Sequence, residues 1–95
     1  MTRGEHIAAL LGSAFAPDEL DVVDESHLHA GHSGSRAGGE THFRVRIVSG
    51  AFAGLNRLAR HRAVNAALAA PFAEGLHALA LDARAPGEAP RRAGP

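Results

Sequence analysis

The sequence lacks cysteine, tryptophan and tyrosine, and phenylalanine is its only aromatic residue. Without cysteine the chain cannot form a disulfide framework, a thiolate nucleophile or a metal site built from its own thiolates. Aromatic residues make up 4% of the chain, which is too few for a platform that stacks the bases of a single strand. The absence of cysteine also fits a reducing compartment.

Net charge and long apolar segments are missing as well. The ten acidic residues cancel the ten basic ones, all of which are arginine, so bulk electrostatics cannot hold the chain on DNA or on a membrane. No segment approaches the roughly 20 apolar residues of a membrane span, and the N-terminus has no signal-peptide pattern. The excess of arginine, alanine and glycine is typical of a GC-rich genome. We therefore expect a cytoplasmic bacterial protein with no membrane partner.

Histidine is abundant, with seven copies of which four lie between His27 and His42. Imidazole is the commonest neutral metal ligand, and it is the side chain that titrates near neutral pH. Because no thiolate accompanies the histidines, we expect metal handling that is shared with a partner rather than a self-contained site.

The first half of the chain predicts one helix followed by two strands. Thr2 and Glu5 form a candidate capping box, and the apolar stripe after them indicates a helix that ends near Pro17. A short strand is expected over residues 20–23. Residues 30–39 are rich in glycine, serine and histidine and are expected to form a loop. Residues 41–47 then alternate between an apolar and a basic face, which predicts the clearest strand of the chain.

The second half predicts a short helical connection near residues 52–54, a long helix over residues 55–72 and a third strand over residues 76–83. One stripe of the long helix contains Leu58, His61, Val64 and Leu68. The expected fold is α+β, in the order αββααβ, with a three-stranded sheet covered by helices on one face. A chain of 95 residues has room for one such domain, over residues 1–85, with a disordered tail over residues 86–95.

Five blocks of sequence carry a resemblance to a known family. Residues 25–29 (ESHLH), 40–45 (ETHFRV), 52–54 (FAG), 60–65 (RHRAVN) and 75–79 (GLHAL) are similar, in order and spacing, to the BolA family. The similarity extends over roughly residues 2–85 and implies a compact class II KH-like fold. The chain departs from RNA-binding KH domains, since Gly54 has no glycine three residues later to form a GxxG loop.

The resemblance also implies a function. BolA-like proteins work with monothiol glutaredoxins and share with them a [2Fe-2S] cluster that contains glutathione. Bacterial members are also described as DNA-binding transcriptional regulators of cell morphology and stress response. His32 corresponds to the histidine form of the family's metal-binding loop, and His77 to the ligand position at the start of the last strand. Alone, the chain is expected to carry no cofactor and to be a monomer or a weak homodimer.

Each candidate residue also has a simpler interpretation. His32 is either a ligand or a solvated loop residue, and His77 is either a ligand or a hydrogen-bonded residue at a strand edge. His61 lies on the apolar stripe, which favours a partly buried, hydrogen-bonded side chain over a ligand. With Arg60 and Arg62 it forms a candidate site for the partner or its glutathione. The remaining histidines are expected to be structural (His27, His29) or exposed (His6, His42).

Two other functions are alternatives to cluster sharing: nucleic-acid binding and catalysis. Five arginines form a candidate patch for nucleic-acid phosphates: Arg44, Arg46, Arg57, Arg60 and Arg62. They support the alternative of a DNA-binding regulator. Catalysis finds no comparable pattern, because neither Ser26 nor Ser49 has the setting of a nucleophile, and no carboxylate pair or phosphate-binding glycine motif is present. We therefore predict a protein that is not an enzyme.

Overall fold

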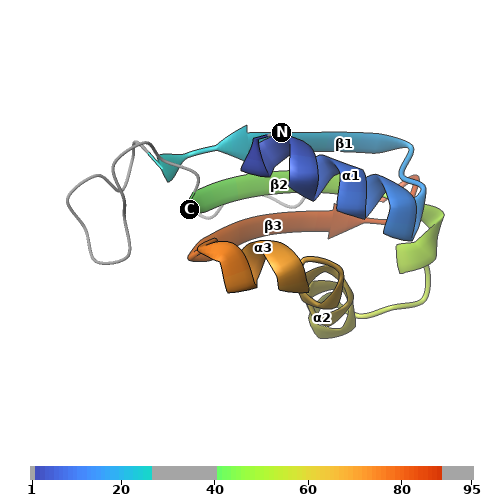
Figure 1. The fold of residues 1–95 in the computed structure, drawn as a ribbon. Coiled ribbons are helices and arrows are strands. Elements are labelled where there is room, and N and C mark those ends of the chain that lie inside the picture. Colours follow the sequence, from blue (N-terminus) through green and yellow to red (C-terminus); the bar gives the residue numbers. More distant parts are fainter. Residues whose placement is uncertain (1, 27–40, 89–95) are drawn as a thin grey trace, which may run out of the picture.

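The computed structural model describes residues 2–26 and 41–88, which form a three-stranded sheet with helices packed against one face (Figure 1). Three of the histidines considered above lie outside the described residues: His27, His29 and His32. No helix in the described part of the chain is long and apolar enough to cross a membrane.

The first helix, α1 (Arg3–Phe15), begins with the predicted capping box. The Glu5 backbone N–H donates to Thr2 Oγ1 at 3.1 Å, and the Thr2 backbone N–H donates to the Glu5 carboxylate at 2.8 Å. The helix ends at Ala16, which takes the left-handed conformation (φ 43°) just before Pro17. Ile7 is completely buried on the inner face of this helix. The prediction for the first helix is therefore confirmed at both ends.

The sheet contains β1 (Glu19–Asp24), β2 (His42–Val48) and β3 (Ala78–Arg84), with β2 in the centre. β1 pairs antiparallel with β2, whereas β3 pairs parallel with it. The apolar side chains of β2, Phe43, Val45 and Ile47, are buried beneath the helices, while Arg44 and Arg46 lie on the face without helices. Because β2 and β3 are parallel, both strands begin at the same end of the sheet.

Three helical segments connect β2 to β3: the 3₁₀ turn η2 (Gly50–Phe52), α2 (Arg57–Ala67) and α3 (Ala69–Glu74). The single helix expected over residues 55–72 is thus divided at Leu68, whose ψ of 21° leaves the helical range. Pro71 explains the division, since its ring clashes with the preceding turn inside a helix but is tolerated in a first turn. The predicted apolar stripe is wrong at its start, because Leu58 is 57% exposed whereas Val64 and Leu68 are buried.

One apolar core lies between the sheet and the helices, and it fixes the positions of the segments that carry function. Phe52, from η2, is completely buried, and its ring centroid lies 5.0 Å from that of Phe15 at the end of α1. Leu76 is buried just before β3 and Leu68 between α2 and α3. The predicted fold, α+β with a three-stranded sheet covered on one face, is confirmed.

Candidate functional site

His77 lies immediately before β3, with its side chain exposed. Its backbone N–H donates to the carbonyl oxygen of Thr41 at 2.7 Å, and the N–H of Ala78 donates to the same oxygen at 3.1 Å. Thr41 is completely buried and directly precedes β2. One buried carbonyl therefore fixes the backbone of His77 where the chain enters β3.

His42 is the neighbour of His77 across the sheet. Their ring centroids lie 5.2 Å apart, with the ring planes inclined at 51°. The expectation that His42 is exposed is wrong, since only 7% of the residue is accessible to solvent. The side chain does lie on the opposite face of the strand from Phe43, but Thr41 Oγ1 lies 2.9 Å from its Nδ1 and His77 packs beside it. Strand alternation gives the face of a side chain and says nothing of what covers it.

Ser26 connects β1 to β2 at this end of the sheet. Its hydroxyl oxygen accepts hydrogen bonds from the backbone N–H groups of Thr41 at 2.9 Å and of His42 at 3.1 Å. The residue is 5% exposed and lies just after β1, so it joins the end of β1 to the start of β2. Sequence reasoning treated Ser26 only as a nucleophile that lacked a setting. A serine two residues after one strand, together with a threonine directly before the next, is the signal that would have indicated this role.

His32, the second predicted ligand, lies outside the described residues, in the segment between Ser26 and Thr41. Both ends of that segment are hydrogen-bonded to each other, and Thr41 is hydrogen-bonded to His77. The covalent chain from Ser26 to His32 spans at most about 20 Å when fully extended. Within residues 2–26 and 41–88, no three histidine, aspartate or glutamate residues are grouped so as to hold a metal ion.

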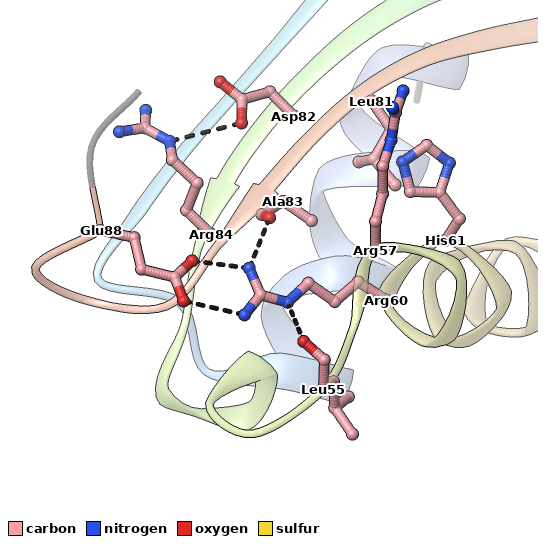
Figure 2. Close-up of a pocket in the computed structure, with 9 residues that line it drawn as sticks. All are labelled: Leu55, Arg57, Arg60, His61, Leu81, Asp82, Ala83, Arg84 and Glu88. Carbon is pink, nitrogen blue, oxygen red and sulfur yellow. Dashed lines mark hydrogen bonds and ion pairs between the residues drawn. The ribbon is translucent and has the colours of Figure 1, made fainter. Parts of the chain in front are cut away.

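A cavity of about 290 Å³ lies at the other end of β3 (Figure 2). It is bordered by the start of α2 and the last residues of β3, including Arg57, His61 and Asp82. His77 and His61 therefore lie at opposite ends of β3 and do not form one site. His61 is half-buried, as its place on the apolar stripe predicts.

Arg60 is held within the domain at the rim of this cavity. Its guanidinium donates to both carboxylate oxygens of Glu88, at 2.6 and 2.9 Å, and to the carbonyl oxygens of Ala83 and Leu55 (Figure 2). Only 13% of its side chain is exposed. The domain was predicted to end at residue 85, whereas the described residues continue to Glu88; residues 89–95 of the predicted tail lie beyond them. Arg60 thus binds Glu88, the last described residue, to α2.

This ion pair makes stability depend on pH. The bidentate hydrogen bonds from Arg60, followed by the backbone N–H of Ala85, lower the pKa of Glu88 from its ordinary value of 4.5 to about 2. A carboxyl group whose pKa is lowered by folding stabilises the fold above pH 4.5, and the contribution is lost as pH falls toward 2. We expect the urea midpoint of Glu88→Gln to fall less over this pH interval than that of the unmodified protein. Arg60→Gln removes the largest cause of the lowered pKa of Glu88 and should also reduce the pH dependence; an undiminished slope in both variants would contradict the assignment.

The two arginines of β2 also have carboxylate partners. Arg44 pairs with Glu25 at 2.9 Å, and Arg46 bridges Asp21 and Glu19 at 2.9 and 3.0 Å. Of the five arginines predicted to form a phosphate-binding patch, three are therefore ion-paired inside the domain. Arg57 and Arg62 are exposed, and within the described part of the chain neither belongs to an ion pair.

Known proteins are similar to this chain in both sequence and fold. A family model described as "BolA-like protein" matches residues 11–88. A Sinorhizobium protein, "Uncharacterized protein in cobS 5'region", is 52% identical over 96% of this chain and 99% of its own length. The solved BolA domain of SufE1 from Arabidopsis thaliana superposes with a TM-score of 0.84 at 43% identity, over 94% of this chain and 98% of that one.

A third relative carries a functional description. "DNA-binding transcriptional regulator BolA" from Vibrio cholerae is 46% identical over 75% of this chain. Several relatives are longer than this chain, which spans 63% of the Vibrio protein and 24% of the full SufE-like protein 1 of Arabidopsis thaliana.

Proposed function

Because the chain belongs to the BolA-like family, we propose that it is a non-enzymatic partner of a monothiol glutaredoxin. In this proposal the two proteins share a [2Fe-2S] cluster that contains glutathione, and the complex serves cluster trafficking or iron and redox regulation. The observation that carries the proposal is the exposed side chain of His77, whose backbone is held by Thr41 at the place where both ends of the His32-containing segment meet.

The donor atoms of the chain fit half of such a site. A [2Fe-2S] cluster has four ligands, and two imidazoles can take the place of two thiolates on one iron, as in Rieske centres. The chain has no cysteine, so the thiolates must come from the partner and from glutathione. When bound, the cluster supplies one-electron redox chemistry and a transferable iron–sulfur unit. His77 supplies one imidazole, and His32 is proposed to supply the other.

The surface around α2 is proposed to meet the partner. Arg62 is exposed on α2, and His61 borders the cavity at the end of β3. Arginine recognises carboxylates through paired hydrogen bonds, so Arg62 suits the carboxylates of glutathione or of an acidic partner surface. Arg60 is already paired with the carboxylate of Glu88. We propose that it forms part of the cavity wall that the partner contacts.

The ligand assignment is tested by anaerobic reconstitution with a monothiol glutaredoxin and glutathione. We expect His77→Ala and His32→Ala each to change the visible circular dichroism of the mixed complex. We also expect the lifetime of the cluster to fall by about tenfold or more, since losing only the hydrogen-bond partner of a metal ligand already costs about 10- to 100-fold in affinity.

His6→Ala is the matched control. His6 lies on α1, with its Nδ1 3.7 Å from Glu74, and has no proposed part in the cluster. Its spectrum and cluster lifetime should match those of the unmodified protein. Spectra and lifetimes that stay the same in both ligand variants would rule out the assignment, and a glutaredoxin that does not bind the chain at all would rule out the partnership.

The second candidate function is DNA binding, which the description of the Vibrio relative favours. In this chain the exposed arginines Arg57 and Arg62 are the residues proposed to contact phosphates, because the arginines of the sheet are occupied by carboxylates. If Arg62 contacts a phosphate, Arg62→Ala should weaken DNA binding. The slope of log K against the logarithm of salt concentration should also fall in magnitude by about one. Arg46→Ala is the control and should leave DNA affinity unchanged. Equally weak binding to every sequence, with no effect of Arg62→Ala, would exclude a specific DNA-binding role.

A further inference from the structure

The geometry points to His42 as a positioning residue, whose buried ring sets the orientation of the exposed ring of His77. The inference rests on the proposed function, in which His77 is the ligand. It assigns to His42 a task that differs from coordination, since the residue is only 7% exposed whereas His77 is exposed.

The ring of His42 is itself fixed in place. Its backbone N–H donates to Ser26 Oγ at 3.1 Å, and its Nδ1 lies 2.9 Å from Thr41 Oγ1. Ser26 and Thr41 are both buried, and Thr41 donates its own backbone N–H to Ser26. A ring that is held at the backbone and at Nδ1 cannot turn without breaking a buried hydrogen bond. His42 therefore offers a rigid surface.

His77 is fixed in its backbone but exposed in its side chain. The Thr41 carbonyl holds the backbone N–H groups of His77 and Ala78, which leaves the torsions χ1 and χ2 to orient the imidazole. The ring centroid of His42, 5.2 Å away, lies within the 4.5–7 Å range of favourable aromatic pairs, and the 51° inclination is intermediate between stacked and edge-to-face geometry. This contact restricts the imidazole of His77 before any partner binds.

Such a restriction matters for a ligand that must meet an incoming iron centre. An exposed side chain that samples several rotamers loses that freedom when it coordinates, and a side chain already held in one rotamer loses less. Residues that orient a ligand of a metal without touching the metal typically change its affinity about 10- to 100-fold when they are replaced. We expect His42→Ala to shorten the lifetime of the shared cluster by a factor in this range.

The experiment has two readouts, one on the isolated chain and one on the mixed complex. In the isolated chain, side-chain coupling constants and ring relaxation from NMR should show one dominant χ1 rotamer for His77. In His42→Ala the ring of His77 should distribute over several rotamers. His42→Phe should retain much of the order, because it keeps an aromatic surface while losing the hydrogen bond to Thr41. In the complex, the cluster should have a shorter lifetime with His42→Ala than with His42→Phe.

The outcomes separate this inference from the proposed function. If the ring of His77 is equally ordered in His42→Ala, or if ring order is lost without any change in cluster lifetime while His77→Ala does shorten it, the positioning role is overturned. If His77→Ala itself leaves the cluster unchanged, the proposed ligand is wrong, and the ring order measured in the isolated chain still decides whether His42 orients His77. Thermal unfolding of His42→Ala and His42→Phe, each with a native-like transition, shows that the effects do not come from loss of the fold.

Discussion

Phe52→Ala is expected to lower the free energy of unfolding by about 3–5 kcal/mol, the range found when a fully buried aromatic side chain is removed. Phe52 is completely buried, and it packs against the ring of Phe15 at a centroid distance of 5.0 Å. It belongs to η2, which joins the end of β2 to the start of α2. A domain of this size typically has a free energy of unfolding of about 5–15 kcal/mol. The substitution should therefore remove a large part of the stability.

Equilibrium unfolding in urea measures this effect. Leu58→Ala is the control, since it truncates an apolar side chain at a site that is 57% exposed. It should change the free energy of unfolding by no more than about 0.5 kcal/mol, as for other surface substitutions. If Phe52→Ala fails to fold, Phe52→Leu provides a smaller and measurable loss. A Phe52→Leu variant as stable as the unmodified protein would show that the core does not depend on this ring.

Ser26→Ala is the second substitution with a large expected effect, although it removes only one oxygen atom. That oxygen accepts hydrogen bonds from two backbone N–H groups, those of Thr41 and His42. Both residues are buried, so the substitution leaves two donors without this partner. Each unsatisfied donor costs about 1–3 kcal/mol. We expect a total loss of about 2–6 kcal/mol, with faster hydrogen exchange at the amides of Thr41 and His42.

Ser13→Ala is the control for this prediction. Ser13 is exposed on α1, where alanine is the better helix former, so its substitution should be neutral or stabilise by a few tenths of a kcal/mol. Ser26→Thr keeps the hydroxyl group and should recover part of the stability. Exchange rates at Thr41 and His42 that stay unchanged in Ser26→Ala would mean that the serine oxygen does not protect these amides.

Most of the fold is predictable from the sequence because its signals are local. Thr2 and Glu5 are three residues apart, and the alternation of Phe43 and Val45 with Arg44 has the period of a strand. Such patterns are complete within one element, so they predict its type and its ends. The division at Leu68 is also local in origin, but Pro71 alone does not say whether a helix bends, ends or restarts.

The candidate site is less predictable, because its contacts join residues that are distant in sequence. Ser26 is hydrogen-bonded to Thr41 across fifteen positions, and Arg60 is paired with Glu88 across twenty-eight. No periodic pattern records which carboxylate an arginine meets, so the five arginines were grouped by charge alone. The burial of His42 likewise depends on His77, which lies beside it only after β3 has docked against β2.

The hydrogen bonds between Ser26 and Thr41 join the two ends of the intervening segment. The pairing of β1 with β2 ends next to these hydrogen bonds, which help to hold the two strands in register. Since the entropy of closing a loop rises only slowly with its length, about 0.6 kcal/mol for each doubling, residues can be gained or lost in the segment at little cost. The fold thus tolerates changes in the length of the segment that carries His32, while the two strands keep their register.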